Sequence, residues 1–437
     1  MIAANIGRIF LEAYNEKYKS NYTAKTFFVE KYYEVFYNHH KYLMSAGNSP
    51  LENPKISWDK MRSGQIPYEI TAKRIDRFKK TIQKISSEPA DASIAIGFPS
   101  LDLTATTSGQ ITNMSLPLNE DDVYLSWIGS GLGIGVQSGL SLLFGNKQIL
   151  LDLYEGWQIY REFLNKTPNL RGNQINSWNG QWLSHRYNKQ TYDPSNHSAA
   201  LNPFGSMKDG GMEVISQSWT KVLVGIARYY PDSLVTAYVY SLGQTNITVG
   251  FVPFELPRIR QPYELYTKYF GYSKKEQVEQ LFGTAIGFTK ACQMGAIGVN
   301  ALEPKGFRDC MDKGVIPKYS DTDEEGTINF NTYQIWLLAM LNNEQLWEKA
   351  HQIAKTLCNH SISDTNAKKV KSQEVTNLMA SVNKKQFIDG LTTIVKGSQN
   401  IEQLAEIAEL INVMPVDNVP YFLTLIRFQY AVENKKS

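Results

Sequence analysis

The sequence predicts an α+β protein, with a mixed α/β N-terminal domain followed by a C-terminal helical bundle. Apolar residues recur at helical spacing near the N-terminus and again through the last quarter of the chain. Between these regions, short apolar runs separated by Gly, Pro and Asn indicate strands and turns. The acidic, breaker-containing segment 313–327 is typical of a linker. We therefore expect two domains, at 1–325 and 326–437.

The composition is that of a globular protein with a mild positive charge. The chain has 437 residues, of which 42% are hydrophobic and 20% are charged, so it can form a substantial core. A net charge of +3 is too small to coat a polyanion, so binding of nucleic acid would require local basic patches. Three scattered cysteines (Cys292, Cys310 and Cys358) fit no disulfide framework and favour a reducing cytoplasm. Arg8 and Glu12 interrupt any apolar core of a signal peptide.

Two helices are expected before residue 45. Apolar residues recur at helical spacing over 1–18. Thr23 is a typical N-cap for a second helix, which is expected to run to about Met44. Residues 47–54 contain helix breakers and predict a loop.

The segment 70–85 predicts an amphipathic helix with a basic face. Ile75, Phe78 and Ile82 lie on its apolar side, and only Asp76 opposes the basic residues of the other side. Such a face can contact phosphates, and a solvated helix face is an equally good explanation. The candidate phosphate contacts of this helix are Lys73, Arg74, Arg77, Lys80 and Lys84.

A change to shorter apolar runs predicts strands from residue 93 onward. The expected strands lie at 93–98, 101–106, 110–116 and 123–128. The glycines that follow them match neither GxGxxG nor a P-loop, so they favour close backbone packing or a tight turn.

The segment 123–146 has no charged residue and could be mistaken for a membrane span. It contains six Gly, four Ser and a Gln, which make its transfer into lipid unfavourable for its length. We expect instead a buried strand, a glycine turn and a short helix.

The stretch 170–190, LRGNQINSWNGQWLSHRYNKQ, follows a helix expected over 149–165. It combines several amides with two tryptophans and two arginines. Amides and arginines read base edges and flat rings stack on bases, so we interpret it as a nucleic-acid contact. The alternative is a polar interdomain loop whose tryptophans are pinned into the core. The candidate contacts are Asn173, Gln174, Asn176, Trp178, Asn179, Gln181 and Arg186.

A helix over 212–229 and a β-hairpin within 234–251 are expected next. The proline-rich segment 252–262 then carries Arg258 and Arg260, which are two further candidate phosphate contacts. A rigid connector between domains is the commoner use of such a segment, and it stays open as the alternative.

After mixed helix and loop at 274–299, the acidic segment 313–327 leads into a predicted helical bundle. Its six short helices are expected at 333–341, 345–357, 373–380, 385–395, 401–410 and 419–432. Lys384 and Lys385 are candidate contacts for a nucleic-acid backbone. Lysines that only aid solubility are the alternative.

No catalytic signature stands out. HExxH, GxSxG and metal-spaced Cys/His clusters are absent from the sequence. The pair His39-His40 has no ordered acid partner and is expected within a helix. We therefore expect a binding protein rather than an enzyme, with no catalytic residue, no metal and no cofactor. Carboxylates that meet only in space are left open.

Four runs resemble, in the same order, the large subunit of a type I CRISPR surveillance complex (Cascade) of the I-B-like branch. They are DVYLSWIGSGLGIGV, LLDLYEGWQIYREFLN, RGNQINSWNGQWL and VPYFLTLIRFQYA. The resemblance implies an N-terminal domain that grips the 5′ handle of the guide RNA and inspects a short motif beside the DNA target. It also implies a C-terminal bundle, similar to the complex's small subunit, that helps to hold the separated DNA strands.

The resemblance further implies a role in antiviral defense within a cytoplasmic ribonucleoprotein complex. The implied partners are guide RNA, double-stranded target DNA, the backbone and small subunits of Cascade, and a recruited nuclease or transposition proteins, with no membrane. The bundle could also be made from an internal start, at Met340 or Met379. Two other functions fit the residues: a soluble carbohydrate-active hydrolase with a Trp-lined cleft, and a protein-interaction scaffold anchored by tryptophans.

Overall fold

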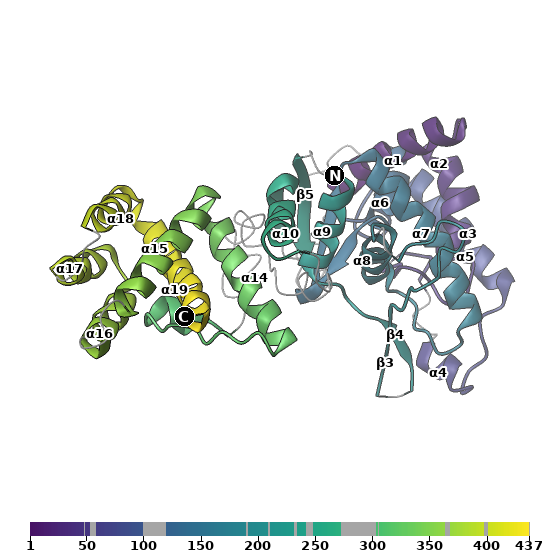
Figure 1. Cartoon of the computed structure of the whole chain (residues 1–437). Coiled ribbons are helices and arrows are strands. Elements are labelled where there is room, and N and C mark those ends of the chain that lie inside the picture. Colours follow the sequence, from purple (N-terminus) through teal and green to yellow (C-terminus); the bar gives the residue numbers. More distant parts are fainter. Residues whose placement is uncertain are drawn as a thin grey trace, which may run out of the picture. The chain divides into compact units, whose positions relative to one another are not determined.

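The chain forms two compact units, Met1–Leu256 and Pro257–Ser437 (Figure 1). The first combines helices with a small antiparallel sheet and the second is helical, which confirms the predicted α+β class. The units divide at Leu256, ahead of the acidic segment in which the sequence places the boundary. The computed structural model describes residues 1–437 except 48, 53–57, 99–118, 189–190, 209, 231–233, 242–247, 272–302, 305, 363–367, 397–400 and 437.

The N-terminal helices follow the sequence prediction as far as Phe36. Thr23 caps the second helix, because its hydroxyl accepts a hydrogen bond from the Thr26 N–H (3.1 Å). The helix ends at Phe36 rather than near Met44, since the guanidinium of Arg161 binds carbonyl oxygens of its last turn. The elements are α1 (Ile2–Tyr18), α2 (Ala24–Phe27), a π-helical turn (Phe28–Tyr32), α3 (Tyr33–Phe36), α4 (Trp58–Arg62) and α5 (Thr71–Ser87).

The strands predicted between residues 93 and 116 are not seen. Residues 93–98 form turns, so that prediction is wrong, and the predicted strands at 101–106 and 110–116 lie outside the described residues. The segment 274–299 also lies outside them.

The run 123–128 is helical rather than extended, as part of α6 (Glu120–Ser130). The side chain of Asn119 caps this helix by accepting a hydrogen bond from the Asp122 N–H (2.8 Å). Acidic residues in the first turn also suit the positive end of the helix dipole. Because Val123–Ser130 are all buried, the run shows no helical period and was expected to be a strand.

The first unit contains a four-stranded antiparallel sheet in the order β1-β2-β5-β6 and a separate β3-β4 hairpin. The predicted hairpin is confirmed, with Leu234 opposite Glu255 and a bulge at Val239/Tyr240. Met212 lies in a strand, so the helix predicted from that residue begins only at α9 (Trp219–Tyr229). The strands are β1 (Ile134–Val136), β2 (Leu140–Phe144), β3 (Phe204–Ser206), β4 (Met212–Val214), β5 (Leu234–Ser241) and β6 (Thr248–Glu255).

Helices pack tightly around this sheet. α7 (Lys147–Lys166) confirms the predicted helix, and α8 (Ile175–Arg186) packs against β1, α7 and α9 (Figure 1). α1 and α6 cross so closely that a Cβ at Gly129 would lie 1.8 Å from the carbonyl oxygen of Ala3. Close backbone packing is therefore confirmed at Gly129, whereas Gly139 has the positive φ (71°) of a tight turn.

The second unit begins inside the predicted connector. α10 (Leu256–Phe270) begins there with Pro257 in its first turn, where no N–H is needed. The two units divide within the segment, so it does connect them, as the end of β6 and the start of α10. All six predicted bundle helices are confirmed, and they enclose an apolar core that includes Phe422 and Phe428. The remaining elements are α13 (Arg308–Asp312), α14 (Glu324–Leu341), α15 (Gln345–Ile362), α16 (Lys368–Met379), α17 (Lys384–Val395), α18 (Ile401–Val413), a 3-10 turn (Val416–Asn418) and α19 (Val419–Lys436).

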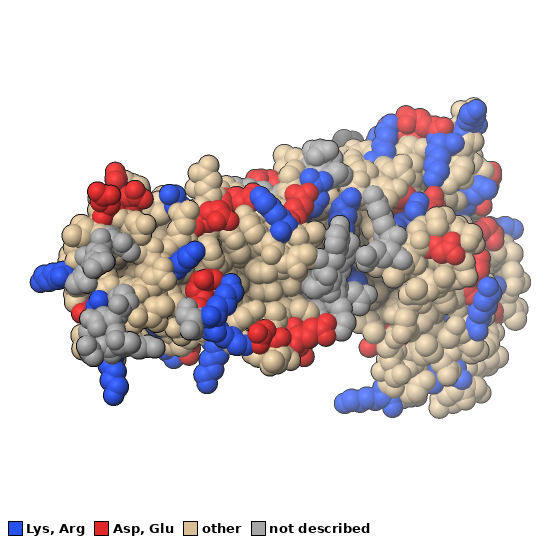
Figure 2. Space-filling view, in the orientation of Figure 1, with Lys and Arg blue, Asp and Glu red and all other residues tan. Residues whose placement is uncertain are grey.

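In the part of the chain that the structure describes, no helix is long and apolar enough to cross a membrane. Basic and acidic side chains are interspersed on the face shown in Figure 2, as the small net charge leads one to expect.

Candidate functional site

Most of the polar-aromatic stretch 170–190 forms the buried helix α8. The run Trp178–His185 is buried along its whole length, because strand β1 and helices α7 and α9 pack around it. The predicted loop is therefore absent here, although the tryptophans are indeed pinned into the core. This burial decides which of the candidate contacts can reach a ligand.

The amides of α8 bind the protein's own backbone. Asn179 is fully buried and donates hydrogen bonds to the carbonyl oxygens of Gly131 (2.9 Å) and Gly133 (2.8 Å). Gln181 donates to the carbonyl oxygen of Ile215 (2.6 Å). These amides satisfy carbonyls of the glycine turn and of the loop before α9. In this structure their burial excludes a direct contact with a bound polymer.

The two tryptophans also have structural partners. Trp178 donates to the carbonyl oxygen of Gly156 (2.8 Å) and stacks on Tyr160, with ring centroids 4.8 Å apart. Trp182 donates to the carbonyl oxygen of Asp152 (2.7 Å). Both indoles are fully buried, so they line no open cleft and anchor no interface. The hydrolase and scaffold alternatives therefore lose the residues on which they rested.

Three further candidates at the edges of α8 are partly buried. Asn176 donates to the hydroxyl of Ser141 (2.9 Å), and Gln174 accepts a hydrogen bond from the Val214 N–H (2.8 Å). The guanidinium of Arg186 lies 3.6 Å from the carboxylate of Asp152 and 3.5 Å from that of Glu155. It also stacks over Tyr192, 4.7 Å from the ring centroid. Burial raises the pKa of the Asp152 carboxyl, against the hydrogen bond from Tyr187. These contacts hold the helix to its surroundings.

Among the described residues of this stretch, the most exposed side chains lie just before α8. The side chains of Arg171 and Asn173 are exposed. The backbone of Asn173 is left-handed (φ 60°), and its N–H donates to the carbonyl oxygen of Tyr42 (2.8 Å). The Arg171 N–H donates to the carbonyl oxygen of Met212 (2.9 Å). This short loop is therefore fixed on both sides while its side chains face solvent. Asn173 was among the sequence candidates, and Arg171 was not.

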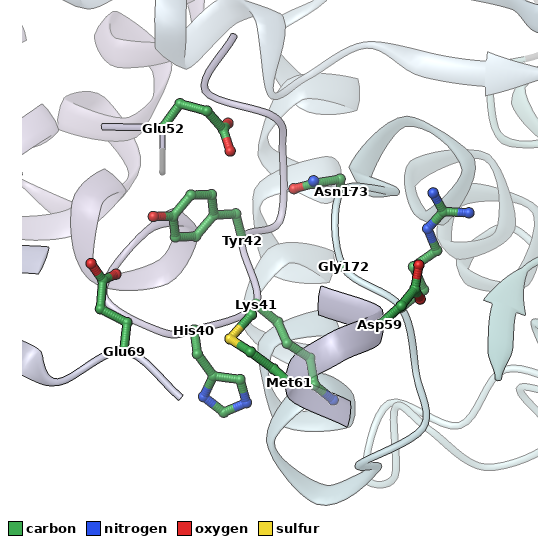
Figure 3. A pocket seen from close by; sticks show the side chains of 10 residues that line it. His40, Lys41, Tyr42, Glu52, Asp59, Met61, Glu69, Gly172 and Asn173 are labelled. Carbon is green, nitrogen blue, oxygen red and sulfur yellow. The ribbon is translucent and has the colours of Figure 1, made fainter. Parts of the chain in front are cut away.

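Arg171 and Asn173 border a pocket of about 240 Å³, here called the Arg171 pocket (Figure 3). Figure 3 shows Glu52 and Asn173 at one end of the view and His40 at the other. Segments far apart in the sequence meet there. The pocket is lined by His40, Lys41, Tyr42, Glu52, Asp59, Met61, Glu69, Arg171, Gly172 and Asn173.

Two buried cations lie close to the pocket: Lys41, which lines it, and Arg161, which binds the Lys41 carbonyl. The ammonium of Lys41 donates to the carbonyl oxygens of Leu164, Thr167 and Pro168, at the C-terminal end of α7. Arg161, only 8% exposed, donates to the carbonyl oxygens of Val35 (2.8 Å) and Lys41 (2.9 Å). Burial lowers the pKa of Lys41 to about 8 and that of Arg161 to about 10. Their hydrogen-bond partners are carbonyls rather than carboxylates.

Three tilted rings lie together at one side of the pocket, and one of them, that of His40, lines it. The ring centroid of His40 lies 3.9 Å from that of His39 and 4.0 Å from that of Tyr68. Burial lowers the pKa of His39 to about 3 and of His40 to about 4, with nearby cations adding to the effect. Both imidazoles are therefore neutral at pH 7. Neutral flat rings of this kind can stack with a nucleobase or another planar group.

Two arginines of α5 bind Glu69, which lines the pocket. The guanidinium of Arg77 donates to both carboxylate oxygens of Glu69 and to the hydroxyl of Tyr42 (2.8 Å). Arg74 donates to the carbonyl oxygen of Glu69 (2.7 Å) and to Thr71 (3.0 Å). These two arginines were predicted to contact phosphates, yet their donors are already engaged within the protein.

The lysines of α5 are the groups that face solvent. Lys73, Lys79 and Lys80 are exposed, and Lys80 forms only an exposed ion pair with Asp76 (2.8 Å). Lys84 is partly buried and donates to the hydroxyl of Ser93 (2.9 Å). Lys79 is an addition to the predicted set, since the helical period alone does not show which of two adjacent lysines points outward.

The remaining predicted phosphate contacts belong to the second unit. Arg260 pairs with Glu264 (3.0 Å), and the side chain of Arg258 lies outside the described residues. Lys384 donates to the carbonyl oxygens of Asn412 (2.7 Å) and Met414 (3.0 Å) near the end of α18, whereas Lys385 is exposed.

Among the described residues, no group of three or more His, Cys, Asp or Glu side chains is placed to hold a metal ion. The lining of the Arg171 pocket offers hydrogen-bonding, aromatic and charged groups to a ligand. Comparisons with family models, with curated proteins and with solved structures found no match for this chain.

Proposed function

We propose that this chain is a non-enzymatic large subunit of a guide-RNA-directed DNA-binding complex, as its resemblance to the Cascade large subunit implies. In this proposal the Arg171 pocket contacts either the 5′ handle of the guide RNA or the motif beside the DNA target. The C-terminal bundle supports the unwound strands. The partners are guide RNA, target DNA and the other Cascade subunits in the cytoplasm, with a nuclease or transposition proteins recruited afterwards.

The observation that carries the proposal is the chemistry of the Arg171 pocket. Arg171 and Asn173 offer exposed hydrogen-bond donors, and Glu52 and Asp59 offer acceptors. Base edges present both kinds of group, so a mixed set can discriminate among bases. The neutral ring of His40, which lies at 40° to the ring of Tyr68, offers a planar surface beside these groups. A pocket of this chemistry suits reading one or two bases better than gripping a long polymer.

The proposal is tested at the two exposed residues of the pocket. Arg171→Ala and Asn173→Gly should each weaken binding of labelled guide RNA or target duplex by roughly tenfold, because each removes a base-reading group. Glycine is chosen at Asn173 because it accepts the left-handed backbone. Affinities are measured by fluorescence anisotropy on the full-length chain, alone and assembled with guide RNA.

Lys208→Ala provides the matched control, since it removes an exposed cation from the same unit at the turn between β3 and β4. It should leave affinity within about twofold of the unaltered chain, a change of under 0.5 kcal/mol. The proposal is contradicted if all three variants bind equally well. It is also contradicted if the unaltered chain has no detectable affinity for either nucleic acid.

A second prediction concerns the exposed lysines of α5. Replacing Lys73, Lys79 and Lys80 together by alanine should weaken binding to every sequence alike. The slope of log affinity against log salt concentration should become less negative by about 2–3, because each phosphate contact contributes about −0.9 to that slope. The measurement is a titration series from low to moderate salt with two unrelated duplexes.

The control for this triple variant has the same change in net charge. Lys17, Lys25 and Lys147 are lysines of the same unit, each paired with a glutamate at 2.8–2.9 Å. Their replacement by alanine should leave the salt slope unchanged. If both triple variants shift the slope equally, net charge rather than the α5 face accounts for the effect.

A further inference from the structure

A wide groove runs between α15 and α18 in the second unit. Its volume is about 910 Å³, and the described residues that line it all belong to these two helices. α15 packs against α16 and α19, and α18 packs against α17. The lining residues are Lys349, Gln352, Ile353, Lys355, Thr356 and Asn359 of α15 and Gln403, Glu406, Ile407, Glu409, Leu410 and Val413 of α18.

The floor of the groove is apolar. Ile353 and Ile407 are buried, Leu410 is half-buried, and Val413 at one end of α18 is 71% exposed. An exposed valine beside buried isoleucines extends the apolar core to the surface. Covering such a strip removes apolar area from water, which favours a partner with its own apolar face.

The two walls carry opposite charge. Lys349 and Lys355 lie on the α15 side, and Glu406 and Glu409 lie on the α18 side; all four are exposed. Figure 2 shows acidic side chains gathered over α18. Among the described residues, no ion pair joins the four across the groove, where the hydroxyl of Thr356 meets the Gln403 side chain at 3.4 Å. The charges are thus available to an occupant.

We propose that this groove binds an amphipathic α-helix of a partner protein. Its apolar stripe would lie on Ile407, Leu410 and Val413, with acidic residues on the flank that faces the lysines and basic residues on the other flank. Lys349 to Asn359 spans ten helical steps, about 15 Å or three turns, which is a sufficient length for a helix with anchors at i, i+3 or i+4 and i+7.

The charge pattern favours this occupant over two others. A nucleic-acid backbone would bring phosphates against Glu406 and Glu409 and be repelled. A helix with a uniform charge would be attracted to one wall and repelled by the other. Only a helix with mixed flanks satisfies both walls, and a given helix does so in one direction along the groove, because reversing it would exchange its flanks.

The experiment uses three fluorescent helical peptides that share one leucine stripe. One has Glu on one flank and Lys on the other, one has Glu on both, and one has Lys on both. Binding to the full-length chain is measured by anisotropy. The mixed-flank peptide should bind at least about tenfold more tightly than either uniform peptide, a difference of about 1.4 kcal/mol.

Two variants separate the groove from the rest of the bundle. Val413→Asp should weaken binding of the mixed-flank peptide at least about tenfold. Val416→Asp should not, because Val416 is equally exposed (73%) but lies outside the groove. The double variant Glu406→Lys, Glu409→Lys makes both walls basic, so it should transfer the preference to the all-Glu peptide.

A general loss of folding would affect all three peptides alike and could not reverse their order. The proposal is overturned if the mixed-flank peptide binds no better than the uniform ones. It is also overturned if Val413→Asp and Val416→Asp behave identically. Concentration-dependent self-association that Val413→Asp abolishes would instead assign the groove to a second copy of this chain.

Discussion

Replacing Gly129 by alanine should destabilise the first unit by roughly 3 kcal/mol. A Cβ at this position would lie 1.8 Å from the carbonyl oxygen of Ala3 and 2.8 Å from the amide nitrogen of Gly7. Both atoms belong to the backbone of α1, so no rotamer change can relieve the overlap. The helices must move apart, and the buried packing between them loosens. Calorimetry should show the melting temperature of this unit lowered by about 6–12 °C.

Gly225→Ala is the matched control, because Gly225 also lies within a buried helix. A Cβ there would meet Tyr187 at 3.5 Å, which is ordinary van der Waals contact. Alanine favours helix by up to about 1 kcal/mol over glycine, so this variant should melt at or above the temperature of the unaltered chain. If Gly129→Ala melts like Gly225→Ala, α1 and α6 do not cross as closely as described.

The parts of the fold that follow from local patterns could be predicted from the sequence. The bundle helices have apolar stripes or clear breakers at their ends, and the β5–β6 hairpin alternates between its two faces. α6 could not be predicted in this way. Its run Val123–Ser130 is buried on every side, so it carries no period that distinguishes a helix from a strand.

The role of the α8 amides could not be predicted for a different reason. Asn179 and Gln181 bind carbonyls that lie 34 to 48 residues away in the sequence. An amide next to a tryptophan has the same composition in a binding loop and in a buried helix. The buried helix differs from the binding loop in having backbone carbonyls, distant in the sequence, next to its amides, and this proximity exists only in the folded chain.

The Arg171 pocket was predicted in part. The polar-aromatic stretch directed attention to Asn173, but the other walls come from His40–Tyr42, Glu52, Asp59 and Glu69. These residues are far from Arg171 in the sequence, so no sequence motif groups them with it. One local signal was present: the polar residues of 171–173 precede the first apolar residue of α8, so they lie outside the helix that buries the rest.

Arg427→Met should destabilise the second unit by roughly 3 kcal/mol, because it leaves buried carbonyls without a donor. The guanidinium of Arg427 is 1% exposed and donates to the carbonyl oxygens of Met379 (2.6 Å), Cys310 (3.0 Å) and Ser381. It thereby joins α19 to the end of α16 and to α13. Methionine fills a similar volume, so the loss reports the hydrogen bonds rather than a cavity.

Arg427→Lys is the comparison that separates charge from geometry. Burial lowers the pKa of Arg427 to about 10, so the group stays charged at pH 7 without a carboxylate partner. Lysine keeps that charge but has one nitrogen in place of three and cannot reach all of the carbonyls at once. Its loss of stability should fall between those of the unaltered chain and Arg427→Met in urea unfolding. Equal midpoints for all three proteins would show that the carbonyls find donors elsewhere, and that α19 is held by apolar packing alone.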